Sequence, residues 1–234
     1  MTEGPPERPR QVGLGTSRLE TLTDGIFAIA MTLLVLNLQV PQIPAALVTG
    51  RLPHALLDLW PKLLSYALSF VVVGVYWVGH HNQFHYIRRA DRPFIWMNIL
   101  FLMCIAFIPF SAALLGAYVH ARIAVGIYGL NLVVVGAALY LIWWYATADH
   151  RLVDPDLAPT VVQAGGRRVL VGVVVYLLAV LLSLLSTVLS VALYIAVPIL
   201  YILPGRIDRH VMGRLTPGAP DGERIPPGTA SSQE

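Results

Sequence analysis

The chain of 234 residues is too hydrophobic for a soluble globular domain, because 56% of its residues are hydrophobic, only 12% are charged and its mean hydropathy is +0.68. Soluble domains carry about 25% charged residues. A helical membrane span takes about 20 residues, so this length holds one membrane domain of about six spans and excludes a separate soluble domain.

The first predicted element is a helix over residues 17–38. Ser17 and Glu20 have the spacing of a capping box, and a long apolar run follows Asp24. Residues 1–16 are rich in Pro, Gly and Arg, which predicts a flexible cytoplasmic tail. They lack the apolar stretch and cleavage site of a signal peptide, so we expect the first span to remain in the mature protein.

Three further helices are predicted in the middle of the chain. A loop over residues 40–53 contains Pro and Gly and separates the first helix from the second. The second covers residues 57–79 with a polar end through His85, the third covers residues 93–115, and the fourth covers residues 123–145. Pro93 fits the first turn of the third helix. Trp143, Trp144 and Tyr145 are typical of an aromatic belt at a membrane interface.

The last two helices are predicted from one apolar stretch. A loop over residues 148–166 holds three Asp and two Pro, and residues 169–203 are then too long for one span. We divide this stretch near Ser186 and Thr187, which gives two short helices and a tight turn. The fold class is therefore all-α and polytopic, with a six-helix membrane domain over residues 17–204 and a flexible cytoplasmic tail over residues 205–234.

Charge distribution predicts the orientation of these spans. Lys and Arg gather on the cytoplasmic side of membrane proteins. With the N-terminus inside, six spans place most of the basic residues in the cytoplasm: Arg8, Arg10, Arg18, Arg88, Arg89, Arg92, Arg151, Arg167, Arg168, Arg206, Arg209, Arg214 and Arg224, which is 13 of the 16 Lys and Arg residues. Only Arg51, Lys62 and Arg122 fall outside. This asymmetry explains the basic pI, so we expect no nucleic-acid partner, a cell-membrane location and both termini in the cytoplasm.

The first helix carries the most informative polar residue. Asp24 stands at the entrance of its apolar run, and ionisable groups there are costly unless they are used or paired. Asp24 could simply interact with the helix dipole or pair with Arg18. Helical spacing puts Ile29 and Leu36 on one stripe with Thr32 or Leu33, and Asp24 on a face rotated by about 100°.

A second group of polar residues lies at the end of the second helix. His80, His81 and His85 could suggest a metal site, but the other four histidines are scattered and no intramembrane carboxylate accompanies the group. We expect hydrogen bonds between helix ends instead, with no metal, no cofactor and no enzymatic activity. Cys104 is the only cysteine, which excludes an intramolecular disulfide.

Three ordered motifs resemble a known family. Arg18-x-x-x-Leu22-Thr23-Asp24, followed by G-I-F-A-I-A-M-T-L-L-V-L, is similar to the R-x-x-x-F-S-D signature and first helix of prokaryotic members of the transmembrane protein 175 potassium-channel family. W-V-G-H-H-N-Q-F at residues 77–84, N-I-L-F-L from Asn98 and I-P-F-S-A-A-L-L-G up to Gly116 are similar too. Leu22 and Thr23 replace the Phe and Ser of the family signature, and both keep an apolar side chain followed by a hydroxyl.

The resemblance implies a homotetramer of six-helix protomers in the lipid bilayer, with the first helix of each chain lining a central pore. It implies a leak-like channel for monovalent cations, K⁺ foremost, without a carbonyl filter. Ile29 resembles the hydrophobic constriction of the family, Leu33 and Leu36 resemble further apolar layers, and Thr32 is a candidate hydroxyl ring. Arg18, Leu22, Thr23 and Asp24 form the signature motif, and its candidate network partners are Trp77, His80, His81 and Asn98.

Physical chemistry allows this function, and two alternatives stay open. An apolar ring gates by dewetting, and K⁺ sheds water more easily than Na⁺, so we expect K⁺ selectivity that is weak. The main alternative is a proton-coupled secondary transporter that uses Asp24 and the histidines of the second helix. Such carriers tend to have midplane sites and internal repeats, whereas the polar groups here cluster at helix ends. A membrane scaffold without transport is the other alternative.

Overall fold

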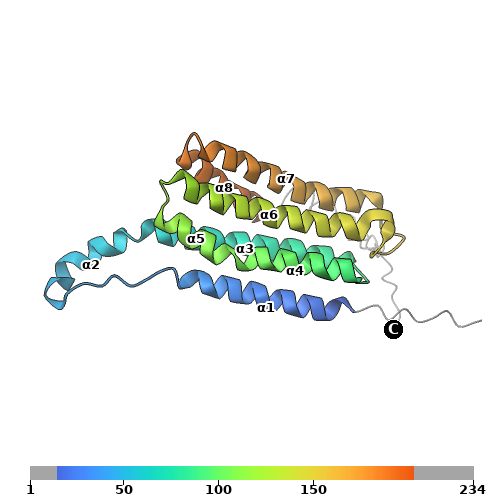
Figure 1. The fold of residues 1–234 in the computed structure, drawn as a ribbon, viewed down its shortest axis with the longest axis horizontal. Coiled ribbons are helices and arrows are strands. Elements are labelled where there is room, and N and C mark those ends of the chain that lie inside the picture. The colour runs from blue at the N-terminus through green and yellow to red at the C-terminus, as the bar shows by residue number, and fades with distance from the viewer. Residues whose placement is uncertain (1–14, 203–234) are drawn as a thin grey trace, which may run out of the picture.

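A computed structural model describes residues 15–202, and these form a bundle of helices (Figure 1). The elements, in chain order, are α1 (Thr16–Val35), the short 3-10 helix η1 (Ala45–Leu47), α2 (Val48–Leu57), α3 (Trp60–Tyr86), α4 (Arg92–Ala106), α5 (Ile108–Ala117), α6 (Arg122–Thr147), the 3-10 helix η2 (Ala148–His150), α7 (Pro159–Ser183) and α8 (Thr187–Ile202). The tails predicted over residues 1–16 and 205–234 lie almost entirely outside the described residues.

The composition of the helices fits a polytopic membrane protein. Among the described residues, four helical segments are long and apolar enough to cross a membrane: Trp60–Tyr86, Arg92–Ala117, Arg122–His150 and Pro159–Ser183. The shorter α8 is also apolar. The all-α, multi-pass membrane class predicted from composition is therefore confirmed.

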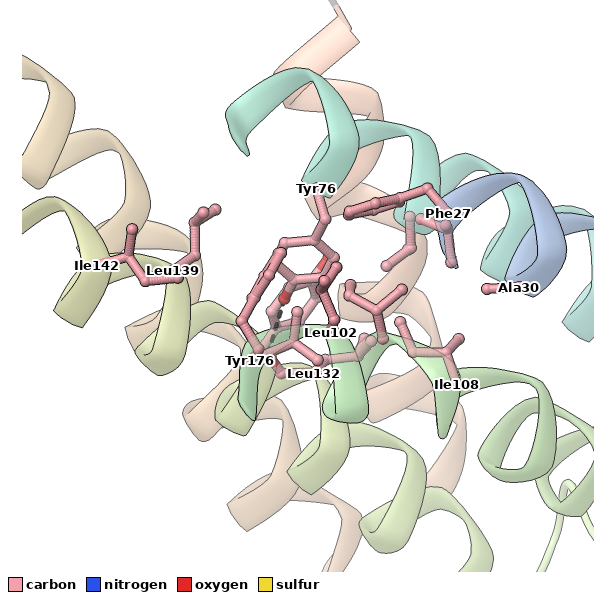
Figure 2. Packing of buried hydrophobic residues seen from close by; sticks show 14 of the residues in the cluster. Phe27, Ala30, Tyr76, Leu102, Ile108, Leu132, Leu139, Ile142 and Tyr176 are labelled. Carbon is pink, nitrogen blue, oxygen red and sulfur yellow. Dashed lines mark hydrogen bonds between the residues drawn. The ribbon is translucent and has the colours of Figure 1, made fainter. Parts of the chain in front are cut away.

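The helices are arranged in layers, with α1 at one edge and α7 at the other (Figure 1). α1 packs against α3, α4 and α5, whereas α6 packs against α4, α5, α7 and α8. Figure 2 shows Phe27 and Ala30 of α1 in the same apolar cluster as Tyr76 of α3 and Leu132 of α6. Tyr76 Oη donates a hydrogen bond of 2.7 Å to the Leu132 carbonyl, which satisfies a buried hydroxyl in this apolar core.

Two interruptions in the helices have local causes. α4 ends at Ala106 and α5 begins at Ile108, so the single helix predicted over residues 93–115 is broken at Phe107. Pro109 stands in the first turn of α5, where its missing N–H removes a bond to the preceding turn. The predicted division near Ser186 is confirmed, because α7 ends at Ser183 and α8 begins at Thr187.

Three local predictions are wrong. The capping box does not form: Gly15 is the N-cap of α1, no side chain caps that end, and Thr21 Oγ1 donates to the Ser17 carbonyl. The loop predicted over residues 40–53 contains η1 and most of α2, which extends away from the bundle and buries none of its residues (Figure 1). Pro53 lies inside α2.

The loop predicted over residues 148–166 is too long, because α7 already begins at Pro159. Gly165 and Gly166, at the end of the predicted loop, lie within α7 and let it approach the ring of Trp143, and a Cβ at Gly165 would lie 3.1 Å from this ring. Trp143 is therefore buried and donates to the Val162 carbonyl, whereas Trp144 is 55% exposed. The aromatic belt predicted for this end of the helix does not include Trp143.

Candidate functional site: an exposed apolar face of α1

α1 has two different faces. Its buried side chains recur every three or four residues and fit against α3, α4 and α5; they are Leu19, Thr23, Phe27, Ala30 and Leu34. The opposite face is apolar as well, yet it is open in the protomer: Ile29 is 55% exposed, Leu33 42% and Leu36 69%. The predicted stripe therefore lies on a surface that no other described part of the chain covers.

The hydroxyl of Thr32 lies on this exposed side. Thr32 Oγ1 donates to the Ile29 carbonyl at 2.9 Å, so the hydroxyl proton is already used within the helix. Its lone pairs remain available, and they are acceptors that suit a cation. Leu22, from the signature motif, is also 49% exposed and extends the apolar face toward the start of α1.

Two side-chain hydrogen bonds hold α1 against its neighbours, one near each end. Trp77 of α3 donates from Nε1 to Asp24 Oδ1 at 2.8 Å. The ring of Trp77 also stacks on His81, with ring centres 5.6 Å apart. Just past the last turn of α1, Asn37 donates from Nδ2 to the Pro109 carbonyl of α5 at 3.1 Å. These two bonds fix the height and the rotation of α1, and therefore the direction of the Ile29 stripe.

A second polar pair lies deeper between α3 and α4. Asn98 donates from Nδ2 to the Phe94 carbonyl at 2.8 Å, which leaves its Oδ1 as an acceptor 3.0 Å from His80 Nε2. His80 therefore carries a proton on Nε2 in this network. Its ring is stacked between Phe84 and Phe101, with ring centres 4.2 Å and 5.3 Å away. This geometry suits a neutral histidine that locks α3 to α4.

The structure brings together some residues of the predicted network and leaves others apart. Asp24 meets Trp77, and His80 meets Asn98. Within residues 15–202, Arg18 forms no ion pair with Asp24, and the buried Thr23 hydroxyl has no hydrogen-bond partner. His81 is exposed and touches the network only through Trp77. In the same part of the chain, no three His, Cys, Asp or Glu side chains come together as metal ligands.

Sequence reasoning missed the bond between Asn37 and Pro109. Asn37 was visible as a polar residue late in an apolar run, which was a signal that it needed a partner. The partner itself is a backbone carbonyl 72 residues away, and no spacing rule identifies it.

Comparison with known proteins shows that the segment containing this face of α1 matches a family of channels. Residues 18–109 match the family described as "Endosomal/lysosomal potassium channel TMEM175". A Streptomyces collinus protein named as a potassium channel is 36% identical over 169 residues, which cover 70% of this chain and 81% of that protein. A Bos taurus protein named as an endosomal/lysosomal proton channel is 36% identical over 103 residues, which cover 42% of this chain and 22% of that protein.

One solved structure extends the likeness to most of the fold. The crystal structure of a lysosomal potassium-selective channel TMEM175 homolog from Chamaesiphon minutus has a TM-score of 0.72 and 36% identity, and the match covers 80% of this chain and 96% of that chain. The matched residues 18–109 include the Ile29 stripe, the Asp24–Trp77 bond, the His80–Asn98 pair and Pro109. The sequence likeness and the unusual face of α1 therefore fall on the same segment.

Proposed function

Because the chain belongs to the TMEM175 potassium-channel family, we propose that it forms a potassium-permeable, leak-like channel for monovalent cations, with Ile29 at its narrowest point. The observation that carries the proposal is the exposed apolar face of α1. Lipid contact alone would explain exposed Ile and Leu, but α1 also begins with Arg18, Glu20 and Asp24, which suit water better than lipid.

The channel is a homotetramer in the cell membrane, with six spans in each protomer and both termini in the cytoplasm. One protomer has a single exposed stripe on α1, whereas four copies around a symmetry axis enclose a path between them. The six spans are α1, α3, α4 together with α5, α6, α7 and α8. The orientation follows the Arg-rich ends of these helices, including Arg88, Arg89 and Arg151.

K⁺ is the permeant ion, and its preference over Na⁺ is weak. Rings of Ile29, Leu33 and Leu36 resist the passage of water, so an ion that crosses them loses part of its hydration shell. K⁺ loses water more easily than Na⁺, and no carbonyl cage is needed for that difference. The hydroxyl of Thr32 offers one polar step inside this apolar path. The channel requires no cofactor, and it is not an enzyme.

A proton-conducting function is the second candidate, because the Bos taurus relative is named as a proton channel. A proton-coupled carrier would have to use Asp24 and His80. Asp24 is exposed and accepts from Trp77, but His80 is buried between Phe84 and Phe101, so His80 lacks the access to water that a relay between the two would need. The geometry therefore favours a passive pore for K⁺ over a carrier.

The test replaces Ile29 with Asn and measures ion flux into liposomes that hold the purified protein. A polar ring at the constriction keeps water in the path, so flux rises and the K⁺/Na⁺ ratio falls. Leu178→Asn is the matched control, because Leu178 is 51% exposed on α7 at the other edge of the bundle. Unchanged flux and selectivity in Ile29→Asn would remove Ile29 from the constriction. Unitary currents of the native protein separate a channel from slow, saturating coupled transport.

A further inference from the structure

The end of the bundle opposite Asp24 holds a positive charge beside the apolar stripe. Lys62 is the only lysine in the chain, and it lies in the first turn of α3. It lines a cavity of about 190 Å³ together with Leu36 and Asn37, at the last residues of the stripe. In this cavity Lys62 is the only charged lining residue.

The packing of α3 on α5 fixes the stem of Lys62. Gly116 of α5 is so close that a Cβ there would lie 3.0 Å from the Lys62 Cα and 3.5 Å from its Cγ. The side chain therefore leaves α3 along the end of α5. The stem of Lys62 is thus held at the cavity that Leu36 also lines.

A negative charge also lies near Lys62, at a second cavity. Asp58 lines a second cavity of about 440 Å³, which Lys62 also borders but Leu36 does not. Within the described residues, no ion pair joins Asp58 to Lys62. The N-terminal end of α3 adds positive potential, because its first turn contains no acidic residue. The Leu36 end of the stripe therefore has a lysine beside it, whereas the other end carries Asp24.

We propose that Lys62 acts as an electrostatic barrier at the Leu36 mouth, so that cations enter the pore less readily from that side than from the Asp24 side. The inference rests on the proposed channel function and names one residue that makes the conductance unequal in the two directions. In the tetramer, four ammonium groups surround this mouth, which is extracellular in the proposed orientation. Charged groups at a pore mouth change the local concentration of permeant ions.

Coulomb's law gives the size of the effect. Four charges about 10 Å from the axis lower the local K⁺ concentration roughly fivefold to tenfold at 10 mM salt, where the Debye length is about 30 Å. At 1 M salt the Debye length is about 3 Å, and the same charges change the concentration by less than about 1.2-fold. The barrier is therefore large only at low ionic strength.

The experiment records K⁺ currents in excised patches from cells that express the full chain, in symmetric KCl at 10 mM and at 1 M. Lys62→Gln raises the current entering from the Leu36 side by about threefold or more at 10 mM and leaves it unchanged at 1 M. Lys62→Arg keeps the charge and keeps the native currents. Arg122→Gln is the matched control, because Arg122 begins α6 at the same end and lines neither cavity.

Two results overturn the inference: equal currents in Lys62→Gln and the native protein at 10 mM, or the same increase in Arg122→Gln. If Lys62→Gln does not fold, the native protein alone tests the inference. Its ratio of currents in the two directions must approach one as the KCl concentration rises to 1 M. A ratio that is insensitive to salt contradicts the barrier. A native protein that carries no K⁺ current overturns the channel function itself, which is a different outcome.

Discussion

The hydrogen bond from Trp77 to Asp24 is predicted to hold α1 in its native rotation. Trp77→Phe keeps an aromatic ring against His81 but removes the donor, and Asp24→Ala removes the acceptor. The two residues are 53 positions apart, so the bond joins α1 to α3 without any help from the local chain.

The expected size of this coupling is about 1 kcal/mol. Hydrogen bonds to charged groups contribute roughly 1.5–3 kcal/mol, and partial exposure to solvent reduces that value. Trp77 is 37% exposed and Asp24 is exposed as well. A coupling of about 1 kcal/mol corresponds to roughly a fivefold change in the ratio of folded to unfolded protein.

A double-mutant cycle measures the coupling without assigning all other losses to the bond. The native protein, Trp77→Phe, Asp24→Ala and the double variant are unfolded chemically in mixed detergent micelles, and the free energies of unfolding are compared. Asp58→Ala combined with Trp77→Phe is the control, because Asp58 lies before α3 begins, at its opposite end. A coupling below about 0.3 kcal/mol for the Trp77–Asp24 pair would refute the reasoning.

Two further predictions concern packing and the other end of α1. Gly129→Ala lowers the free energy of unfolding by about 1–3 kcal/mol, because a Cβ there would overlap the ring and hydroxyl of Tyr194. Gly126→Ala is the control and is tolerated, because the atom nearest to its Cβ is Ser183 Oγ at 3.6 Å. Equal unfolding midpoints for the two variants would contradict this prediction. Asn37→Ala lowers the free energy of unfolding by about 1 kcal/mol, because it removes the hydrogen bond to the Pro109 carbonyl. Gln39→Ala, on the exposed neighbouring surface, is the control and changes this free energy little. Equal losses for the two variants in chemical unfolding would argue against the Asn37 bond.

The features that the sequence predicted well are local ones. The spacing of Ile29, Leu33 and Leu36 predicts a common stripe because helical geometry repeats every 3.6 residues, and the structure has all three exposed, two on α1 and Leu36 at its C-cap. The turn near Ser186 is predictable because an apolar run of that length exceeds one span. Both inferences need only the periodicity of one helix or the thickness of one bilayer.

The features that the sequence did not predict depend on partners distant in the chain. The predicted loop over residues 148–166 ends at Gly166, but the contact of Gly165 and Gly166 with the ring of Trp143 places both glycines within α7. Asn37 needs a carbonyl that Pro109 supplies, and residue spacing does not identify that pair. The motif around Thr23 predicts a polar network, yet its buried hydroxyl has no hydrogen-bond partner within the described residues. Tertiary packing decides these cases, and it is not encoded in short patterns.

α1, the helix proposed to line the pore, is less suited to contact with lipid than the four helical segments that are long and apolar enough to span a membrane. α1 is not among the described helices that meet the length and hydropathy of a span, because charged residues occupy its first turns. An isolated helix of this kind inserts poorly when its charges approach the hydrocarbon core. α1 is instead held by a buried stripe, by Trp77 and by Asn37. A polar entrance followed by an apolar, uncovered face suits a helix that meets water at one end and closes a narrow path with its own copies further along.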